Sequence, residues 1–193
     1  MERRSRLGPD REAEIFTAVV HLVKEHGYEK VTMQQIAAES HSSTATLYRR
    51  WEGKPRLIIE AIRHLKPHPM DVVDTGTLRG DLLAGVSPMA ETAADDHDLI
   101  ASIHNAARDD EALAQAIREV MAEPVQRAVE TVIDRAVRRG EIAPDPPGRR
   151  FIHELLLAPV AVRPMISGQH PDEEYLTAYI DAVILPALGV RRP

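Results

Sequence analysis

The stretch VTMQQIAAESHSSTATLYRRWEGK, residues 31–54, decides the fold of this chain. It begins with a capping box, in which the hydroxyl of Thr32 accepts a backbone N–H of the first helical turn and the side chain of Gln35 reaches back to the cap. Apolar residues follow at helical spacing. The pattern predicts a short helix that begins after Thr32 and ends near Ser40.

A second short helix follows the turn formed by His41 and Ser42. Ser43 is a good N-cap, and only Leu47 and Trp51 are clearly apolar in the residues after it. One apolar residue per turn suits a helix that packs on one side and meets polar groups on the other. This arrangement favours a helix-turn-helix whose second helix enters a DNA groove.

Helices are also predicted on both sides of this motif. Before it, apolar residues recur at helical spacing from Asp10 until Gly27, which fits the left-handed position that ends a helix. After it, a helix begins near Pro55 and runs to about Leu65. Residues 1–9 form either a solvated tail or an arm that follows phosphates or enters the minor groove. The basic residues of this segment are Arg3, Arg4 and Arg6.

The remainder of the chain has the same helical periodicity, with no alternating strand pattern and no Asn-Gly hairpin signal. Pro124 should kink or split the helix that contains it, because proline removes a backbone donor and clashes with the preceding turn. Two apolar helices are expected at about 149–166 and 171–188. They are apolar over more than one narrow face, which favours burial on two sides, one against their own domain and one against a second subunit. A large intramolecular core is the alternative. The residues expected at the subunit interface are Leu155, Leu156, Val160, Tyr175, Tyr179 and Val183.

Composition limits the class of protein. A length of 193 residues allows two domains, and the absence of cysteine excludes disulfides, thiolate metal sites and a cysteine nucleophile. No apolar run of about 18 residues is present, and Glu12, Glu14 and Glu25 interrupt the first apolar stretch, as they would not in a signal peptide. We therefore expect a soluble cytoplasmic protein with no membrane partner.

Charge is divided unevenly along the chain. The net charge of −6 argues at first against a nucleic-acid partner. Residues 1–66, however, carry 12 Lys and Arg against 9 Asp and Glu, a net charge of +3, which leaves −9 for residues 67–193. The basic character therefore lies with the helix-turn-helix, where a DNA-binding surface needs it.

Residues 27–54 carry a specific family signature. Its members are Gly27, Tyr28, Val31, Thr32, Met33, Ile36, Ala37, Ser43, Thr46, Leu47, Tyr48, Trp51 and Lys54. With these residues the segment resembles the helix-turn-helix of the TetR family of bacterial transcriptional regulators, over roughly the first third of the chain. The turn departs from the family pattern, which has Gly then Val where this chain has His41 and Ser42. We expect a weakened turn, because a non-glycine residue adopts the left-handed conformation at a cost of roughly 1 kcal/mol and a serine supplies no apolar contact.

The resemblance implies an all-α fold with an N-terminal three-helix helix-turn-helix domain followed by a larger helical domain. Residues 1–53 would form the arm and DNA-binding domain, residues 54–66 a connecting helix, and residues 67–193 the effector-binding and dimerisation domain. The implied function is a ligand-responsive repressor that binds a palindromic operator as a homodimer and is released by a small-molecule effector of unknown identity. No cofactor and no metal are implied.

The DNA contacts are expected on the two helices of the motif. We expect Thr44 and Thr46 to reach base edges or thymine methyl groups, and Arg49 to contact a guanine or a phosphate. Tyr48 and Lys54 resemble the phosphate contacts of the family. The other two candidates lie near helix N-termini, where backbone contacts to phosphates are favourable. The complete set is Gln34, Ser43, Thr44, Thr46, Tyr48, Arg49 and Lys54.

An effector pocket in the second domain is implied by the resemblance alone. Methionines suit an adaptable cavity and a few polar residues would orient a ligand, but both suit an ordinary core equally well. The candidate lining residues are Met89, His104, Asn105, Met121 and His153. Ligand would then shift the 54–65 helix and change the separation of the two recognition helices.

Two other functions stay open at this point. One is a DNA-binding regulator that needs no ligand. The other is a helical metal-dependent enzyme, for which the spacing is unfavourable because the chain lacks H-E-x-x-H, G-x-S-x-G and a phosphate loop. The residues that such an enzyme would use are His97, Asp98, His104, Glu111 and His153.

Overall fold

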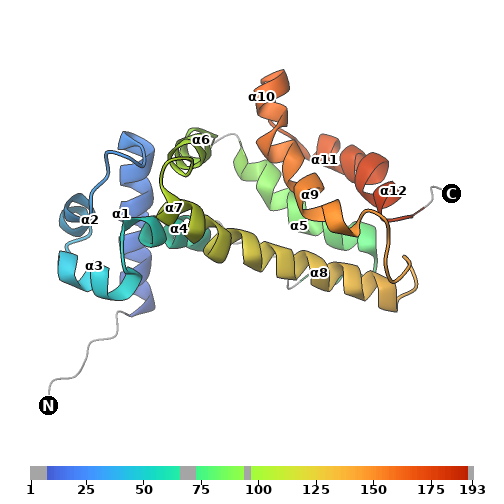
Figure 1. Ribbon diagram of the computed structural model, residues 1–193, viewed down its shortest axis with the longest axis horizontal. Helices are drawn as coiled ribbons and strands as arrows, with labels where there is room; N and C mark the ends of the chain where they lie inside the picture. The colour runs from blue at the N-terminus through green and yellow to red at the C-terminus, as the bar shows by residue number, and fades with distance from the viewer. Residues whose placement is uncertain (1–7, 66–72, 94–96, 191–193) are drawn as a thin grey trace, which may run out of the picture. The chain divides into compact units, whose positions relative to one another are not determined.

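Two compact helical units make up the described part of the chain (Figure 1). The computed structural model describes residues 8–65, 73–93 and 97–190, without the side chains of residues 89–93 and 97–98. Every regular element in these ranges is a helix, which confirms the predicted all-α class. Residues 1–7 of the predicted N-terminal arm, with Arg3, Arg4 and Arg6, lie outside the described residues, and Pro9 already belongs to the first helix.

The first unit contains the helix-turn-helix. Its elements are α1 (Pro9–His26), α2 (Met33–Glu39), α3 (Thr44–Trp51), α4 (Lys54–Leu65), most of α6 (His97–Ala106), α7 (Glu111–Ile117) and the π-helical turn η2 (Arg118–Ala122). Figure 1 shows α2 and α3 beside the long helix α1. The ring of Trp51 is completely buried and lies 5.6 Å from the ring of Phe16 between centroids. The aromatic residue at the end of α3 therefore anchors this helix to α1.

The first unit extends further along the chain than the sequence indicated. Residues 98–123 were expected in the effector-binding domain, but they pack with the N-terminal helices. The reason is their apolar stripe, since Ile103, Leu113 and Val120 are buried in the same core as Ile15 and Leu57. Helix α4 therefore packs against α7 and η2 as well as against α1.

The second unit has its own hydrophobic core. Its elements are α5 (Leu78–Ala93), most of α8 (Glu123–Arg138), the 3-10 turn η3 (Arg149–Phe151), α9 (Ile152–Ala161), α10 (Arg163–Ser167), α11 (Glu173–Tyr179), the π-helical turn η4 (Ile180–Ile184) and α12 (Leu185–Ala187). Its core is formed mainly by side chains of α5, α8, α9, α11 and η4, including Leu82, Val132, Ile152 and Ile184.

Prolines shape both units without ending every helix. Pro124 was expected to kink or split its helix, and the α-helical pattern is indeed interrupted directly before it by the π-helical turn η2. The second π-helical turn, η4, precedes Pro186 in the same way. A proline ring clashes with the carbonyl four residues earlier, and the wider π turn relieves that clash. The predicted 149–166 helix is divided, because α9 ends at Ala161 and α10 begins at Arg163, just before Pro164.

A buried carboxylate ties α5 to α8 in the second unit. Asp81 accepts hydrogen bonds from the N–H of Thr75 at 2.6 Å and from its hydroxyl at 2.8 Å. Arg139 donates to Asp81 Oδ2 at 3.1 Å, and Arg135 lies 3.9 Å from the same oxygen. Asp81 is 1% exposed, so its charge is balanced entirely by these partners.

Candidate nucleic-acid interface

The cap that starts α2 has the predicted geometry. The N–H of Gln35 donates to the Thr32 hydroxyl at 3.3 Å, and the N–H of Thr32 donates to Gln35 Oε1 at 2.8 Å. Val31 before the cap and Ile36 after it are fully buried. Gln34, between them on α2, is exposed. The capping box therefore fixes the start of α2 and leaves Gln34 at the surface.

Ser43 starts α3 as predicted. Its hydroxyl accepts the N–H of Thr46 at 3.1 Å and lies 2.9 Å from the Thr46 hydroxyl. Leu47 and Trp51 are both 0% exposed, so one face of the helix belongs to the core. Thr44 and Thr46 are partly exposed next to it.

The outer face of α3 is polar and basic. Tyr48 is 50% exposed, and Arg49 and Arg50 are exposed beside it. Arg50 makes an ion pair with Glu12 of α1 at 3.3 Å. Within the described ranges Arg49 makes no ion pair and no hydrogen bond with another side chain. The guanidinium of Arg49 is therefore available to an external partner, whereas that of Arg50 is already paired.

Lys54 begins α4 and faces the protein. Its ammonium donates to the backbone oxygen of Tyr28 at 3.1 Å and lies 4.2 Å from the centre of the Tyr28 ring. Burial lowers the pKa of Lys54, while the charges of Asp110 and Glu29 act in the opposite direction. An ammonium has three donors, so the contact with Tyr28 leaves donors for a phosphate.

Tyr28 joins the helix-turn-helix to α6 and α7, a contact that the sequence did not indicate. Its hydroxyl donates to Asp110 Oδ2 at 2.7 Å, and its N–H donates to the Ser102 hydroxyl at 3.1 Å. Burial and the hydrogen bond to Asp110 raise the pKa of Tyr28, and the same hydrogen bond lowers the pKa of Asp110. No local sequence signal could have revealed a pair separated by 82 residues.

Tyr28→Phe is expected to lower the free energy of unfolding by roughly 1.5–3 kcal/mol, the range for a hydrogen bond to a charged group. Urea denaturation measures the change. Tyr48→Phe is the matched control, because the Tyr48 hydroxyl has no hydrogen bond within the described part of the chain, and it should change stability by less than about 0.5 kcal/mol. Equal values for the two variants would show that the Asp110 contact contributes nothing.

The candidate effector residues with described side chains are divided between the two units. His104 and Asn105 are exposed on α6, and Met121 is partly buried against the core of the first unit. His153 belongs to the second unit, where its Nε2 lies 3.6 Å from Glu130. The side chain of Met89 lies outside the described set. The pocket stays a prediction.

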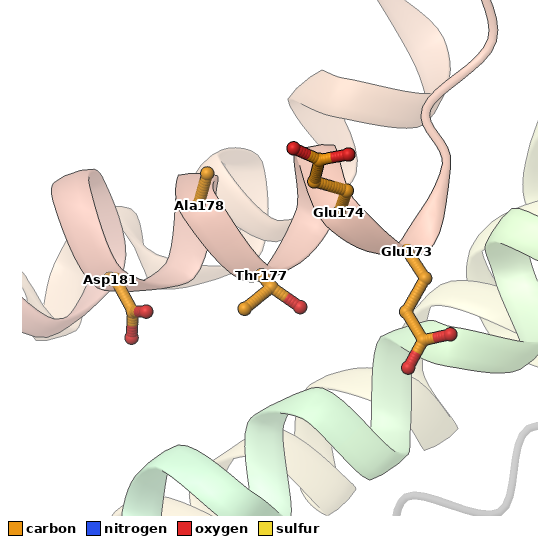
Figure 2. A pocket seen from close by; sticks show the side chains of 5 residues that line it. All are labelled: Glu173, Glu174, Thr177, Ala178 and Asp181. Atoms are coloured by element: carbon orange, nitrogen blue, oxygen red, sulfur yellow. The ribbon is translucent and has the colours of Figure 1, made fainter.

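A surface depression in the second unit involves other residues. It is lined by residues of α11 and the following turn, namely Glu173, Glu174, Thr177, Ala178 and Asp181 (Figure 2). Arg79 binds Asp181 through two hydrogen bonds of 2.6 and 2.9 Å. The depression is open and acidic, and one of its three carboxylates, that of Asp181, is already paired. No motif in the sequence pointed to these residues.

The predicted interface residues differ in burial. Leu156 belongs to the core of the second unit, and Leu155, Tyr175 and Tyr179 pack partly against it. Val160 and Val183 are partly exposed. Several exposed apolar side chains lie nearby in the chain, in η3, α9 and α10 and between the last two: Phe151, Leu157, Val162, Met165 and Ile166, of which Met165 and Ile166 are the most exposed.

The enzyme candidates with described side chains are also divided between the two units. His104 and Glu111 lie in the first unit and His153 in the second, and the side chains of His97 and Asp98 are outside the described set. The described residues contain no group of three or more histidine, cysteine or acidic side chains able to hold a metal ion. No helix in the same residues is both long and apolar enough to cross a bilayer.

Comparisons with known proteins cover both units. Residues 15–61 match the family model for bacterial regulatory proteins of the tetR family, and residues 72–183 match the model for the C-terminal domain of tetracyclin repressor-like proteins. The DNA-binding transcriptional repressor TetR of Mycobacteroides abscessus is 32% identical over 180 residues, which is 92% of this chain and 94% of that protein.

Solved structures agree with these matches. The TetR family transcription regulator SCO0332 superposes with a TM-score of 0.73 at 25% identity, over 95% of this chain and all of that one. The regulator FadR of Bacillus subtilis, solved in complex with stearoyl-CoA, has a TM-score of 0.65 at 19% identity, over 93% of this chain and 98% of that one. At 19% identity, the similarity to FadR shows the fold alone.

Proposed function

Because this chain belongs to the TetR family of DNA-binding transcriptional regulators, we propose that it represses transcription as a homodimer bound to a palindromic operator, from which a small-molecule effector releases it. The family is one of regulators and not of enzymes. The proposal depends mainly on the two faces of α3: its apolar side is completely buried, while Tyr48 and Arg49 are exposed. We also place the protein in the cytoplasm, because the operator DNA of a bacterial regulator lies in that compartment.

The proposed contacts follow from the two faces of α3. Thr44 and Thr46 would reach base edges, and Arg49 would bind a guanine or a phosphate because its guanidinium has no internal partner in the described residues. Tyr48 would hydrogen-bond a phosphate. The remaining phosphate contacts are assigned to Gln34, Ser43 and Lys54. The Ser43 hydroxyl caps α3, so a phosphate would meet backbone N–H groups at that helix start.

A homodimer supplies the second recognition helix. Two copies of α3 must lie roughly 34–36 Å apart to enter successive major grooves on one side of DNA. The exposed apolar side chains of α9 and α10 support a subunit interface in this region, because Met165 and Ile166 are 82% and 81% exposed. We extend the predicted interface to include them.

Effector release is proposed from the family and from the placement of α4. This helix packs against α1 and also against α7 and η2. A rearrangement of α7 would therefore shift α4 and, through it, the helix-turn-helix. Any compound that lowers affinity for DNA must itself bind the DNA complex more weakly, by the same factor. A compound that binds free and DNA-bound protein equally is not an effector, and failure of every compound tested would favour a ligand-independent regulator.

Selection from a random duplex library by the purified full chain tests the function. We expect enrichment of one palindromic sequence, with half-sites about one helical turn apart and two chains per duplex by light scattering. Enrichment of a single, non-repeated half-site would contradict the homodimer. Failure to enrich any sequence would contradict specific DNA binding. The enriched sequence is called the selected duplex below.

Two substitutions on α3 should have different effects on DNA binding. Tyr48→Ala is expected to weaken binding about equally for the selected duplex and for its single-base variants, because a phosphate contact carries no sequence information. Thr46→Ala should alter the order of preference among those variants. Gel shifts at fixed salt measure both. If the two variants bind every duplex as the parent does, neither residue contacts DNA.

A further inference from the structure

Helix α2 ends in a turn that puts a histidine where glycine is usual. The N–H of Ser42 donates to the oxygen of Ala37 at 2.8 Å, and the N–H of His41 donates to the oxygen of Ala38 at 3.2 Å. This pair of hydrogen bonds defines a Schellman motif, whose left-handed position His41 occupies with φ of 47°. A residue with a Cβ atom adopts that conformation at a cost of roughly 1 kcal/mol, which a further contact can offset.

Arg11 of α1 provides such a contact. Its Nη2 donates to the oxygen of Ser40 and to the oxygen of His41, the latter at 3.0 Å, and lies 3.1 Å from the Ser42 hydroxyl. The carbonyls at the end of a helix have no partner within it and carry the negative end of the helix dipole. The guanidinium therefore binds the oxygens of the peptide groups before and after the left-handed Cα of His41.

We propose that Arg11 is a positioning residue for DNA binding, which clamps the His41 turn and so fixes the direction of α3. The inference rests on the proposed function. Ser43 caps α3 directly after the turn, so the conformation of the turn determines how α3 leaves α2. Loss of the clamp lowers the fraction of protein in which α3 has the direction needed for DNA binding, and the apparent affinity falls in proportion to that fraction.

Direct phosphate binding by Arg11 is the competing role. Its side chain is 34% exposed, which would allow a phosphate to approach. However, Nη1 pairs with Glu14 and Nη2 is engaged with the turn, so both terminal nitrogens already have protein partners. Salt dependence separates the two roles, because a lost phosphate contact reduces the slope of log affinity against log salt by about one per chain, and a lost clamp does not.

Arg11→Met tests the clamp with the selected duplex. It keeps a long apolar stem and removes every donor. We expect affinity to fall about tenfold with an unchanged salt slope. Arg11→Lys keeps the charge and should lose affinity as well, because one ammonium does not reproduce a guanidinium whose two terminal nitrogens bind Glu14 and the turn at the same time. Circular dichroism and thermal unfolding establish that both variants are folded.

His41→Gly provides the rescue. Glycine adopts the left-handed conformation without strain, so Arg11→Met combined with His41→Gly should bind within about threefold of the parent. Glu14→Ala is the matched control, since it removes the other partner of Arg11 and leaves the turn contacts, and its affinity should stay within about twofold of the parent.

Each outcome bears on one proposal. Tenfold weaker binding with an unchanged slope and glycine rescue supports the clamp. A shallower salt slope without rescue, or full affinity in Arg11→Lys, makes Arg11 a phosphate contact and overturns the clamp. Unchanged affinity in Arg11→Met overturns the clamp as well, because Arg11 would then contribute nothing to DNA binding. Failure of the parent chain to enrich any duplex would instead overturn the proposed function.

Discussion

Arg49→Ala is expected to weaken binding of the selected duplex about 10- to 100-fold, which corresponds to the loss of roughly 1–3 kcal/mol for a specific arginine contact. The reason is the position of Arg49, which is exposed on α3 and has no ion pair within the described ranges. Fluorescence anisotropy at fixed salt measures the change. A repeated library selection with the variant shows whether one base position loses its preference, as a guanine contact requires, or all positions are affected alike, as a phosphate contact requires.

Arg50→Ala is the control for this experiment. It removes the same charge from the next position of the same helix, but Arg50 is paired with Glu12 at 3.3 Å. We expect a loss of affinity below about threefold and a change in stability below about 1 kcal/mol, as for other exposed ion pairs. If Arg50→Ala weakens binding more than Arg49→Ala does, α3 faces DNA in a different orientation from the one proposed.

Asp81→Ala is expected to lower the free energy of unfolding by about 3 kcal/mol, because it breaks a buried ion pair and leaves charge without a partner. Asp81 is 1% exposed, and its carboxylate holds both Thr75 and Arg139. Asp74→Ala is the matched control. The carboxylate of Asp74 pairs with Arg139 at 3.2 Å but its side chain is 55% exposed, so its loss should cost less than about 1 kcal/mol. Similar values for the two variants would mean that burial adds nothing to this network.

The same network should make stability depend on pH. Burial would raise the pKa of Asp81, but the hydrogen bonds from Thr75 and Arg139 and the charge of Arg135 outweigh burial and hold the pKa below its ordinary value. A depressed pKa adds stability above the unfolded value of about 4, and this stability is lost as the pH falls below it. Urea denaturation from pH 6 to pH 3 should therefore show a difference between the parent and Asp81→Asn that narrows toward acid. A difference that stays constant over this range would contradict the shift.

The parts of the site that were predictable depend on neighbours in the sequence. Thr32 and Gln35 form the predicted capping box, and Ser43 caps α3 as expected, because each contact spans three residues. Leu47 and Trp51 were identified as buried from their helical spacing, and both are fully buried. Local hydrogen-bonding preferences and apolar periodicity act over one or two turns, so the sequence alone is sufficient to define them.

Contacts between distant residues were not predictable in this way. The weakened turn at His41 was expected, but the contact with Arg11 spans 29 to 31 residues, and no periodicity connects the two. In the same way, nothing in the pattern around Lys54 indicated that its ammonium lies over the ring of Tyr28. Such contacts depend on how helices cross, and side-chain spacing along one helix does not specify that.

The sequence by itself determined the all-helical class, the helix-turn-helix between residues 31 and 54, and the family, because these depend on short-range caps and on an apolar repeat that matches the helical turn. Only the tertiary structure decided that residues 98–123 join the DNA-binding unit, that Arg49 rather than Arg50 is unpaired on α3 within the described chain, and that Arg11 supports the turn. These features arise when helices far apart in the sequence pack together, since packing determines which charges meet and which stay exposed to solvent.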